Sequence, residues 1–233
     1  MKALSYVLLV FFLGTTTVCA RIPAYDLKHW PAGKSPEEIG KRITVKFLNT
    51  PHTYYGNIVP NNPPVQVTYP DVCTWLGGLW FAGITKDVDL RNRLENRFSP
   101  LFTTEKHLQP KPNHVDNNVF GSVPLELYLQ TGQQKYLDLG LFYADTQWNL
   151  PENPKPEEKA WIDKGYSWQT RIWIDDMFMI TAVQVQAYRA TKDRKYIDRA
   201  AKEMVFYLDK IQLGNGLFYH SPDTRFCWGR GNG

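Results

Sequence analysis

Several kinds of protein are excluded by what this chain lacks. It has 3 Cys in 233 residues, and the first of them, Cys19, lies in a segment interpreted below as a leader. Cys73 and Cys227 then permit one disulfide at most, and neither a disulfide framework nor a cysteine metal cage. Free, buried thiols are the interpretation we favour for both.

Charge of one sign is not concentrated anywhere in the sequence. The formal net charge is +4, and no block of Lys and Arg forms a basic stripe, so nucleic acid is not an expected partner.

No stretch after the first 20 residues is long and apolar enough to span a membrane. His-Glu-x-x-His, Cys-x-x-Cys and Gly-x-Ser-x-Gly patterns are all missing, and the sequence predicts neither a metal nor a cofactor.

The first 20 residues carry the features of a secretory signal peptide. Lys2 supplies a positive charge, residues 6–13 are apolar, and Val18-Cys19-Ala20 offers a cleavage site of small residues. The mature protein, 21–233, is then expected to begin at Arg21 and to be periplasmic or secreted. Cys19 raises lipidation as an alternative, which Val18 before it disfavours.

Helices, and not strands, dominate the predicted architecture. Ser35, Pro36 and Glu38 form a helix start with an N-cap, a proline at the first turn and a capping box. Ile39, Ile43 and Phe47 follow at four-residue spacing and predict the apolar face of that helix.

A short polar turn then recurs three times, each time between an apolar helix and an amphipathic one. The turns are Thr85-Lys86-Asp87, Thr131-Gly132-Gln133 and Thr191-Lys192-Asp193, and a segment rich in Pro and Glu, 149–164, interrupts the repeat. Repeated helical hairpins predict an all-α fold, either an open solenoid or a closed α/α toroid. In a toroid the more apolar first helix of each hairpin would form the inner ring, with its N-terminal end at the central cavity.

The most unusual local pattern is Trp173-Ile-Asp-Asp-Met-Phe-Met179, which sets Asp175 and Asp176 in an apolar segment. A buried carboxylate is costly unless it is paired, and burial raises its pKa toward the range of a useful proton donor. The structural alternative makes one Asp a helix cap and leaves the other in water. Asp116, in His114-Val-Asp-Asn, is either a turn residue or a second carboxylate facing Asp175.

Two further motifs lie near the end of the chain. Gly216-Leu-Phe-Tyr-His220 places a histidine after three apolar residues, a pattern that taken alone favours a core histidine. Trp228-Gly-Arg-Gly-Asn-Gly233 sets Arg230 among three glycines, which let the backbone approach closely while the arginine could pair with a carboxylate.

Together, in this order, the three motifs resemble glycoside hydrolase families 88 and 105, the unsaturated glucuronyl and rhamnogalacturonyl hydrolases. The resemblance covers residues 69–233. It implies an (α/α)6 toroid, a six-hairpin barrel of which this chain holds about the first half. It also implies removal of a 4,5-unsaturated uronic acid from oligosaccharides that lyases release from pectin-like polysaccharides. We expect a C-terminally truncated member that on its own is inactive and poorly soluble.

The resemblance also assigns roles to residues. Asp175 matches the acid and base of the family, Asp116 matches the second carboxylate, and Asp176 is expected to be a neighbour that points elsewhere. The cleft residues it implies are Trp173, Met179, His220, Trp228 and Arg230. Two alternatives stay open: a non-catalytic carbohydrate-binding protein, and an ordinary inverting glycosidase on the same fold.

Overall fold

The computed structural model describes residues 29–52 and 64–232, and divides the chain into one unit that ends at Ser35 and a second, Pro36–Gly233. Every helix of the described residues lies in the second unit. The predicted signal peptide, 1–20, lies outside the described residues. The α-helices of the second unit are α1 (Pro36–Leu48), α2 (Tyr69–Thr85), α3 (Val88–Phe98), α4 (Val115–Asn118), α5 (Ser122–Thr131), α6 (Gln134–Thr146), α7 (Pro156–Asp163), α8 (Ile174–Thr191), α9 (Arg194–Ile211) and α10 (Gly229–Asn232). Short 3-10 turns cover Ser99–Phe102, Lys106–Leu108 and Val119–Gly121.

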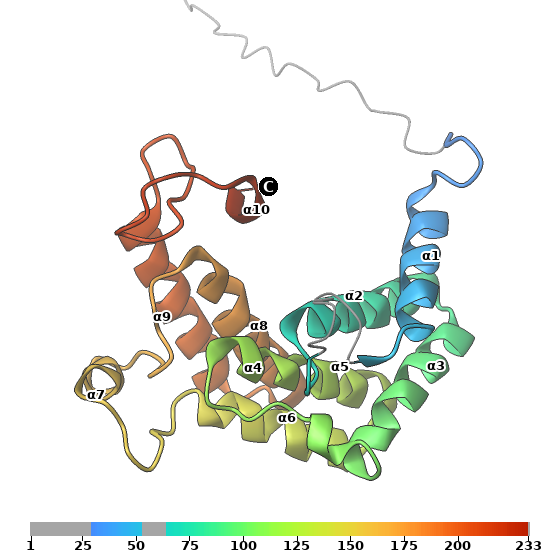
Figure 1. Ribbon diagram of the computed structural model, residues 1–233, viewed down its shortest axis with the longest axis horizontal. Helices are drawn as coiled ribbons and strands as arrows, with labels where there is room; N and C mark the ends of the chain where they lie inside the picture. The colour runs from blue at the N-terminus through green and yellow to red at the C-terminus, as the bar shows by residue number, and fades with distance from the viewer. Residues whose placement is uncertain (1–28, 53–63, 233) are drawn as a thin grey trace, which may run out of the picture. The chain divides into compact units, whose positions relative to one another are not determined.

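The fold is all-α, as predicted (Figure 1). Within the described ranges, β-structure is confined to the isolated bridges Gln212 to Phe218 and Ser221 to Thr224. The helix predicted from Ser35 begins at Pro36.

The three predicted hairpins are present as α2–α3, α5–α6 and α8–α9. In each, the first helix ends on a left-handed residue directly after the threonine: Lys86 (φ 57°), Gly132 (φ 71°) and Lys192 (φ 63°). A left-handed residue reverses the chain and lets its own N–H return to a carbonyl of the last turn. The repeat in the sequence is therefore a repeat of turn geometry.

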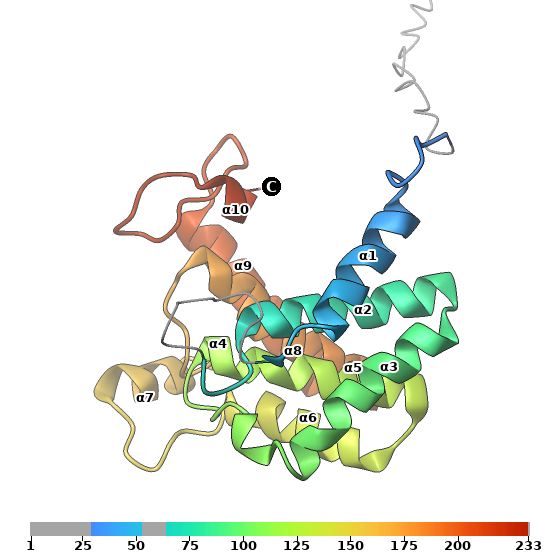
Figure 2. The ribbon, with the colours of Figure 1, turned by 45° about the vertical axis from the view of Figure 1, so that its right-hand side comes forward.

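The first helices of the hairpins pack on one another. Helix α2 contacts α5, and α5 contacts α8, while α3, α6 and α9 each pack against the first helix of their own hairpin (Figure 2). The central helices are the apolar ones because both of their sides are covered by helices. The first helices of the described hairpins thus contact one another, as an inner ring would require, and the closed ring itself stays a prediction.

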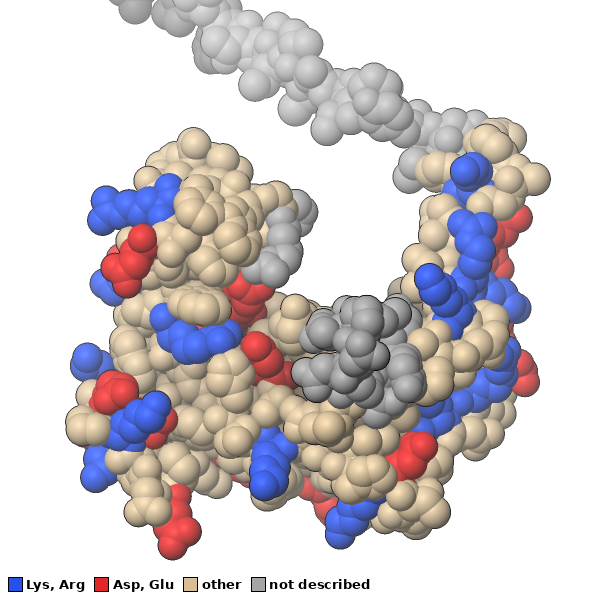
Figure 3. All heavy atoms as spheres, in the orientation of Figure 1, with Lys and Arg blue, Asp and Glu red and all other residues tan. Residues whose placement is uncertain are grey.

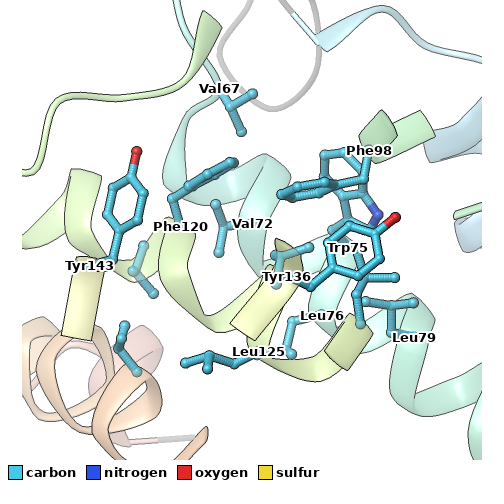
Figure 4. Close-up of a cluster of buried hydrophobic side chains, with 14 of the residues drawn as sticks. Val67, Val72, Trp75, Leu76, Leu79, Phe98, Phe120, Leu125, Tyr136 and Tyr143 are labelled. Carbon is cyan, nitrogen blue, oxygen red and sulfur yellow. The ribbon is translucent and has the colours of Figure 1, made fainter. Parts of the chain in front are cut away.

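Aromatic side chains fill the core that joins the first two hairpins (Figure 4). The ring of Phe98 stacks on Phe120 at 5.6 Å between centroids, and Trp75 meets Phe98 edge-on at 5.2 Å. Trp75 also donates its indole N–H to the carbonyl oxygen of Leu94, 3.1 Å away. Much of the aromatic content of the chain therefore stabilises packing, since offset and edge-on ring pairs add to the free energy of burial.

Two sequence predictions fail in this unit. Ile43 is 50 % exposed, so the predicted stripe of Ile39, Ile43 and Phe47 is wrong in part, although Phe47 is fully buried. A Cβ on Gly40 would overlap the ring of Phe81, which shows that α1 turns its small residue toward α2. Cys73 and Cys227 are free, as favoured, but both are exposed and not buried.

The segment rich in Pro and Glu contains a helix that the sequence did not predict, α7 (Pro156–Asp163). Pro156 opens it, and Glu158 accepts a hydrogen bond from the backbone N–H of Lys155 at 2.8 Å. This is the proline-first, acidic first turn of a helix start, hidden in a segment whose composition suggested a loop.

Charged side chains of both signs are interspersed on the face shown in Figure 3, separated by uncharged areas. None of the described helices combines the length and apolar character that a membrane span requires.

Candidate active site

The three motifs picked out in the sequence come together at the first turn of α8. The backbone N–H of Ile174 donates to the carbonyl oxygen of His220 at 2.9 Å. Asn232 joins the other two motifs, because its amide accepts from the N–H of Phe218 at 2.6 Å and donates to the carbonyl oxygen of Phe218 at 3.0 Å. The three motifs are thus held together by one backbone hydrogen bond and by the side-chain amide of Asn232.

Gly231 explains one of the glycines in the last motif. A Cβ at this position would lie 2.7 Å from Cδ1 of Ile174, closer than packed carbon atoms allow. The backbone of α10 can approach the start of α8 because that Cβ is missing.

A pocket of about 580 Å³ lies between these motifs and the start of α2. Its lining is largely apolar, and it consists of Tyr69, Cys73, Ile174, Asp175, Met177, Phe178, Met179, Thr181, Met204, Phe218 and Gly231. The carboxylate in this lining is Asp175. A separate cavity of about 480 Å³ lies against α3 and contains none of the predicted site residues.

Asp175 opens to solvent and faces a histidine. Its side chain is 24 % exposed, and Oδ2 lies 3.8 Å from Nδ1 of His220. His220 is buried, and its Nδ1 has no hydrogen-bond partner among the described residues. The separation is too long for a direct hydrogen bond.

Aromatic rings fix the orientation of that histidine. The imidazole stacks on Trp228 at 4.4 Å between centroids with 17° between the planes, and Trp173 lies tilted against it at 5.2 Å. His220 is therefore buried, as the pattern favoured, and it is also part of the site. Trp173 and Trp228 remain 44 % and 40 % exposed and leave aromatic surface beside Asp175.

Asp176 lies in a different environment from Asp175. It is fully buried, and its two oxygens accept five hydrogen bonds. Oδ1 receives Nε and Nη2 of Arg171 at 3.1 and 2.6 Å, while Oδ2 receives Tyr207 Oη at 2.9 Å and the backbone N–H groups of Arg171 and Trp173 at 3.1 and 3.4 Å. Asp176 therefore points away from Asp175, as predicted, and it is the helix cap of the structural alternative.

Asp116 lies beside the same arginine. Its Oδ1 is 3.4 Å from Arg171 Nη2, and Nη1 of that guanidinium is 3.1 Å from Nε2 of His114. His114 caps α4 by accepting the N–H of Asp116 at 3.2 Å. Oδ2 of Asp116 lies 3.6 Å from Nδ1 of His114, and the side chain is 36 % exposed, so Asp116 is held between two residues and can still be reached from solvent.

Two predicted cleft residues remain, Met179 and Arg230. Met179 is 6 % exposed and forms part of the pocket wall. Arg230 lies in α10, but its side chain falls outside what the structure describes, so its pairing with a carboxylate stays a prediction.

Sequence reasoning missed Arg171, Tyr207 and Asn232, which hold the site together. Asn232 was within the last motif and could have been recognised as the one side chain there able to bond to backbone in both directions. Arg171 and Tyr207 belong to no motif, and their partners are distant in the chain or reached through a turn. Among the described residues no group of three or more His, Cys, Asp or Glu side chains is placed to hold a metal ion.

These features define an all-α hairpin protein with a carboxylate in an apolar pocket flanked by aromatic rings. Residues 41–233 match the family model described as Glycosyl Hydrolase Family 88, and the chain belongs to that family. No curated protein and no solved structure matches it.

Proposed function

We propose that this protein is a hydrolase that removes a 4,5-unsaturated uronic acid from the non-reducing end of oligosaccharides released by lyases from pectin or rhamnogalacturonan. Membership of family 88 supports a glycoside hydrolase. The observation that carries the proposal is the difference between two neighbouring carboxylates: Asp175 opens into the 580 Å³ pocket, whereas Asp176 is buried among donors.

In the proposed reaction Asp175 acts first as an acid and then as a base. It protonates C4 of the vinyl ether, water adds its oxygen to C5, and the proton that this water loses returns to Asp175. The resulting hemiketal opens and expels the remaining sugar as an alcohol. One carboxyl group can serve both steps because it recovers its proton in each cycle.

Other residues of the site have supporting roles in this proposal. Asp116 assists at the ring and positions the substrate. His220 packs against both tryptophan rings and holds them beside Asp175, and Trp173 and Trp228 supply ring faces against which a sugar can pack. Arg230 is the candidate partner of the uronic carboxylate.

The proposed architecture of the family enzyme is the six-hairpin (α/α)6 toroid. The three hairpins described here, joined through their first helices α2, α5 and α8, support it, because an inner ring requires that contact. The starts of α2 and α8 both contribute to the pocket that holds Asp175, as an inner ring with its helix N-termini at the cavity would require.

Loss of the enol absorbance in the ultraviolet tests the proposal. The full-length protein should remove this absorbance from an unsaturated disaccharide made by a lyase. Asp175→Asn should lower kcat by at least about 1000-fold, since its amide cannot deliver the proton. Asp198→Asn, on the exposed face of α9, is the matched control and should leave kcat unchanged. Turnover of saturated glycosides with no loss of enol absorbance would favour the inverting glycosidase, and binding without turnover the non-catalytic alternative.

A further inference from the structure

The loop that leads into α8 has an unusual backbone at Ile172. This residue has φ 60°, in the left-handed region that β-branched residues rarely occupy. Its N–H donates to Tyr207 Oη at 3.1 Å, and the same hydroxyl donates to Asp176 Oδ2 at 2.9 Å. Strained backbone of this kind persists only where its surroundings impose it, and it is concentrated at functional sites.

The effect of that conformation is to place Arg171 against α8. The backbone N–H and the guanidinium of Arg171 both bond to Asp176, and Cζ lies 4.6 Å from the ring centre of Trp173. A residue that bonds through its backbone, through two side-chain nitrogens and through a ring has little freedom to move. Arg171 is consequently fixed to the first turn of α8.

The outer part of the guanidinium reaches a different element. Nη2 contacts Asp116 and Nη1 contacts His114, both at the start of α4 and more than fifty residues earlier in the chain. Arg171 therefore joins the start of α4 to the start of α8, the two elements that carry Asp116 and Asp175.

Arg171 is poorly suited to bind the acidic sugar itself. Its Nε and Nη2 already bond to carboxylates, and two carboxylates face one guanidinium, so the group carries no excess positive charge toward a further anion. A planar fork that contacts two carboxylates fixes their relative positions, which is the geometric property that distinguishes arginine from lysine.

Building on the proposed function, we propose that Arg171 is a positioning residue that sets the separation of the two site carboxylates, by fastening Asp116 to the buried Asp176 one residue after Asp175. It touches neither substrate nor reacting atoms. Its contribution to turnover passes through Asp116, whose side chain is partly exposed.

The test compares Arg171→Lys with Arg189→Lys in the full-length protein. Arg189, at the other end of α8, also pairs with a nearly buried carboxylate, Glu126, at 2.7 Å, and is far along the helix from Asp175. Both variants keep the charge and lose the fork. Each should lower Tm, but only Arg171→Lys should lower kcat, by about 10- to 100-fold, with KM nearly unchanged.

A double-variant cycle separates positioning from general damage to the fold. If Arg171 acts through Asp116, adding Arg171→Lys to Asp116→Asn should change kcat by no more than about twofold. A full additional loss in the Asp116→Asn background would overturn the proposal, as would a wild-type kcat in Arg171→Lys alone.

Hydrogen exchange tests the fastening without any need for turnover. Amides of residues 113–121 should exchange several-fold faster in Arg171→Lys than in the wild type, and at the wild-type rate in Arg189→Lys. Unchanged exchange at these amides would overturn the positioning role even if the enzyme is active. An inactive wild type with faster exchange in Arg171→Lys would instead reject the proposed function and leave the link from α4 to α8 established.

Discussion

At the scale of single residues, Asp175 and Asp176 are neighbours in the chain but differ in burial, partners and chemistry. Five donors surround Asp176, whereas Asp175 is a quarter exposed beside a histidine that is too far for a hydrogen bond. Removing one partner of a buried ion pair costs about 3–5 kcal/mol of stability. Asp176→Asn is therefore not a neutral control for Asp175→Asn, because it would weaken the pairing of Arg171.

Glu203 is a second buried carboxylate, and it holds the loop that precedes Arg171. It accepts the N–H of Ser167 at 2.6 Å and the hydroxyl of Thr170 at 3.1 Å. Burial raises the pKa of Glu203 from 4.5 to about 7, and the nearby Asp176 adds to this shift. Between these two pH values the folded protein binds more protons at this site than the unfolded chain does.

Stability should consequently fall as the pH rises from about 4.5 to about 7 and change little from this source above that. A shift of this size corresponds to about 3 kcal/mol in the free energy of unfolding. Urea unfolding at pH 5 and pH 8 measures it, and Glu203→Gln should abolish this part of the pH dependence. Glu157→Gln, at an exposed position of α7, should not. An unchanged slope in Glu203→Gln would contradict the assignment.

At the scale of elements, each hairpin turn needs a residue with a left-handed backbone. Glycine adopts this conformation without strain at one turn, and lysine adopts it at a cost in free energy at the other two. Gly132 meets no steric penalty at φ 71°, but Lys86 and Lys192 occupy the same left-handed region with a Cβ. A Cβ added at Gly132 would find no atom within 4 Å, so at that turn the backbone angle alone decides the cost of a side chain.

Exchanging these residues should therefore change stability in opposite directions. We expect Lys192→Gly to raise the free energy of unfolding by about 0.5–1 kcal/mol and Gly132→Ala to lower it by about 1 kcal/mol. Urea titrations of both variants, compared with the wild type, measure these differences. Destabilisation by Lys192→Gly would show that the turn is held by contacts of the lysine and not limited by its backbone.

The hairpins could be predicted from the sequence because their turns are local. A threonine, a left-handed residue and an Asp or Gln at the N-cap position recur at each turn, and signals of this kind lie in consecutive residues. The face of α1 could not be predicted in the same way. Gly40 and Phe47, and not Ile43, face the neighbouring helix, and this choice depends on how closely α1 approaches Phe81.

The candidate site was predictable to a similar extent. Asp175, His220 and Trp228 lie in motifs, and the structure brings them together. Arg171 could not be found, because its importance rests on the left-handed Ile172 and on Asp116, and neither relation leaves a periodic pattern. The exposure of Cys73 also could not be predicted from the sequence, because it depends on the pocket that α2 forms with α8.

At the scale of the whole molecule, the site depends on contacts between segments that are distant in sequence. The start of α2, the first turn of α8 and the segment around α10 form one pocket, and Arg171 links α8 to α4. The turn of each hairpin is determined by neighbouring residues, whereas the proposed reaction requires the elements that form the pocket to be packed together.

The position of solvent deuterium in the product tests the central claim most directly. When the full-length protein acts on an unsaturated uronyl disaccharide in D2O, Asp175 should deliver deuterium to C4, on one face of the ring only, because a fixed carboxyl group approaches from one side. NMR of the first product should show a single deuterium at C4 in one configuration, and Asp175→Asn should not form this product. Release of the neighbouring sugar with deuterium in both configurations at C4 would contradict the account, since the enol freed by attack at the glycosidic bond would take its deuterium from solvent on either face.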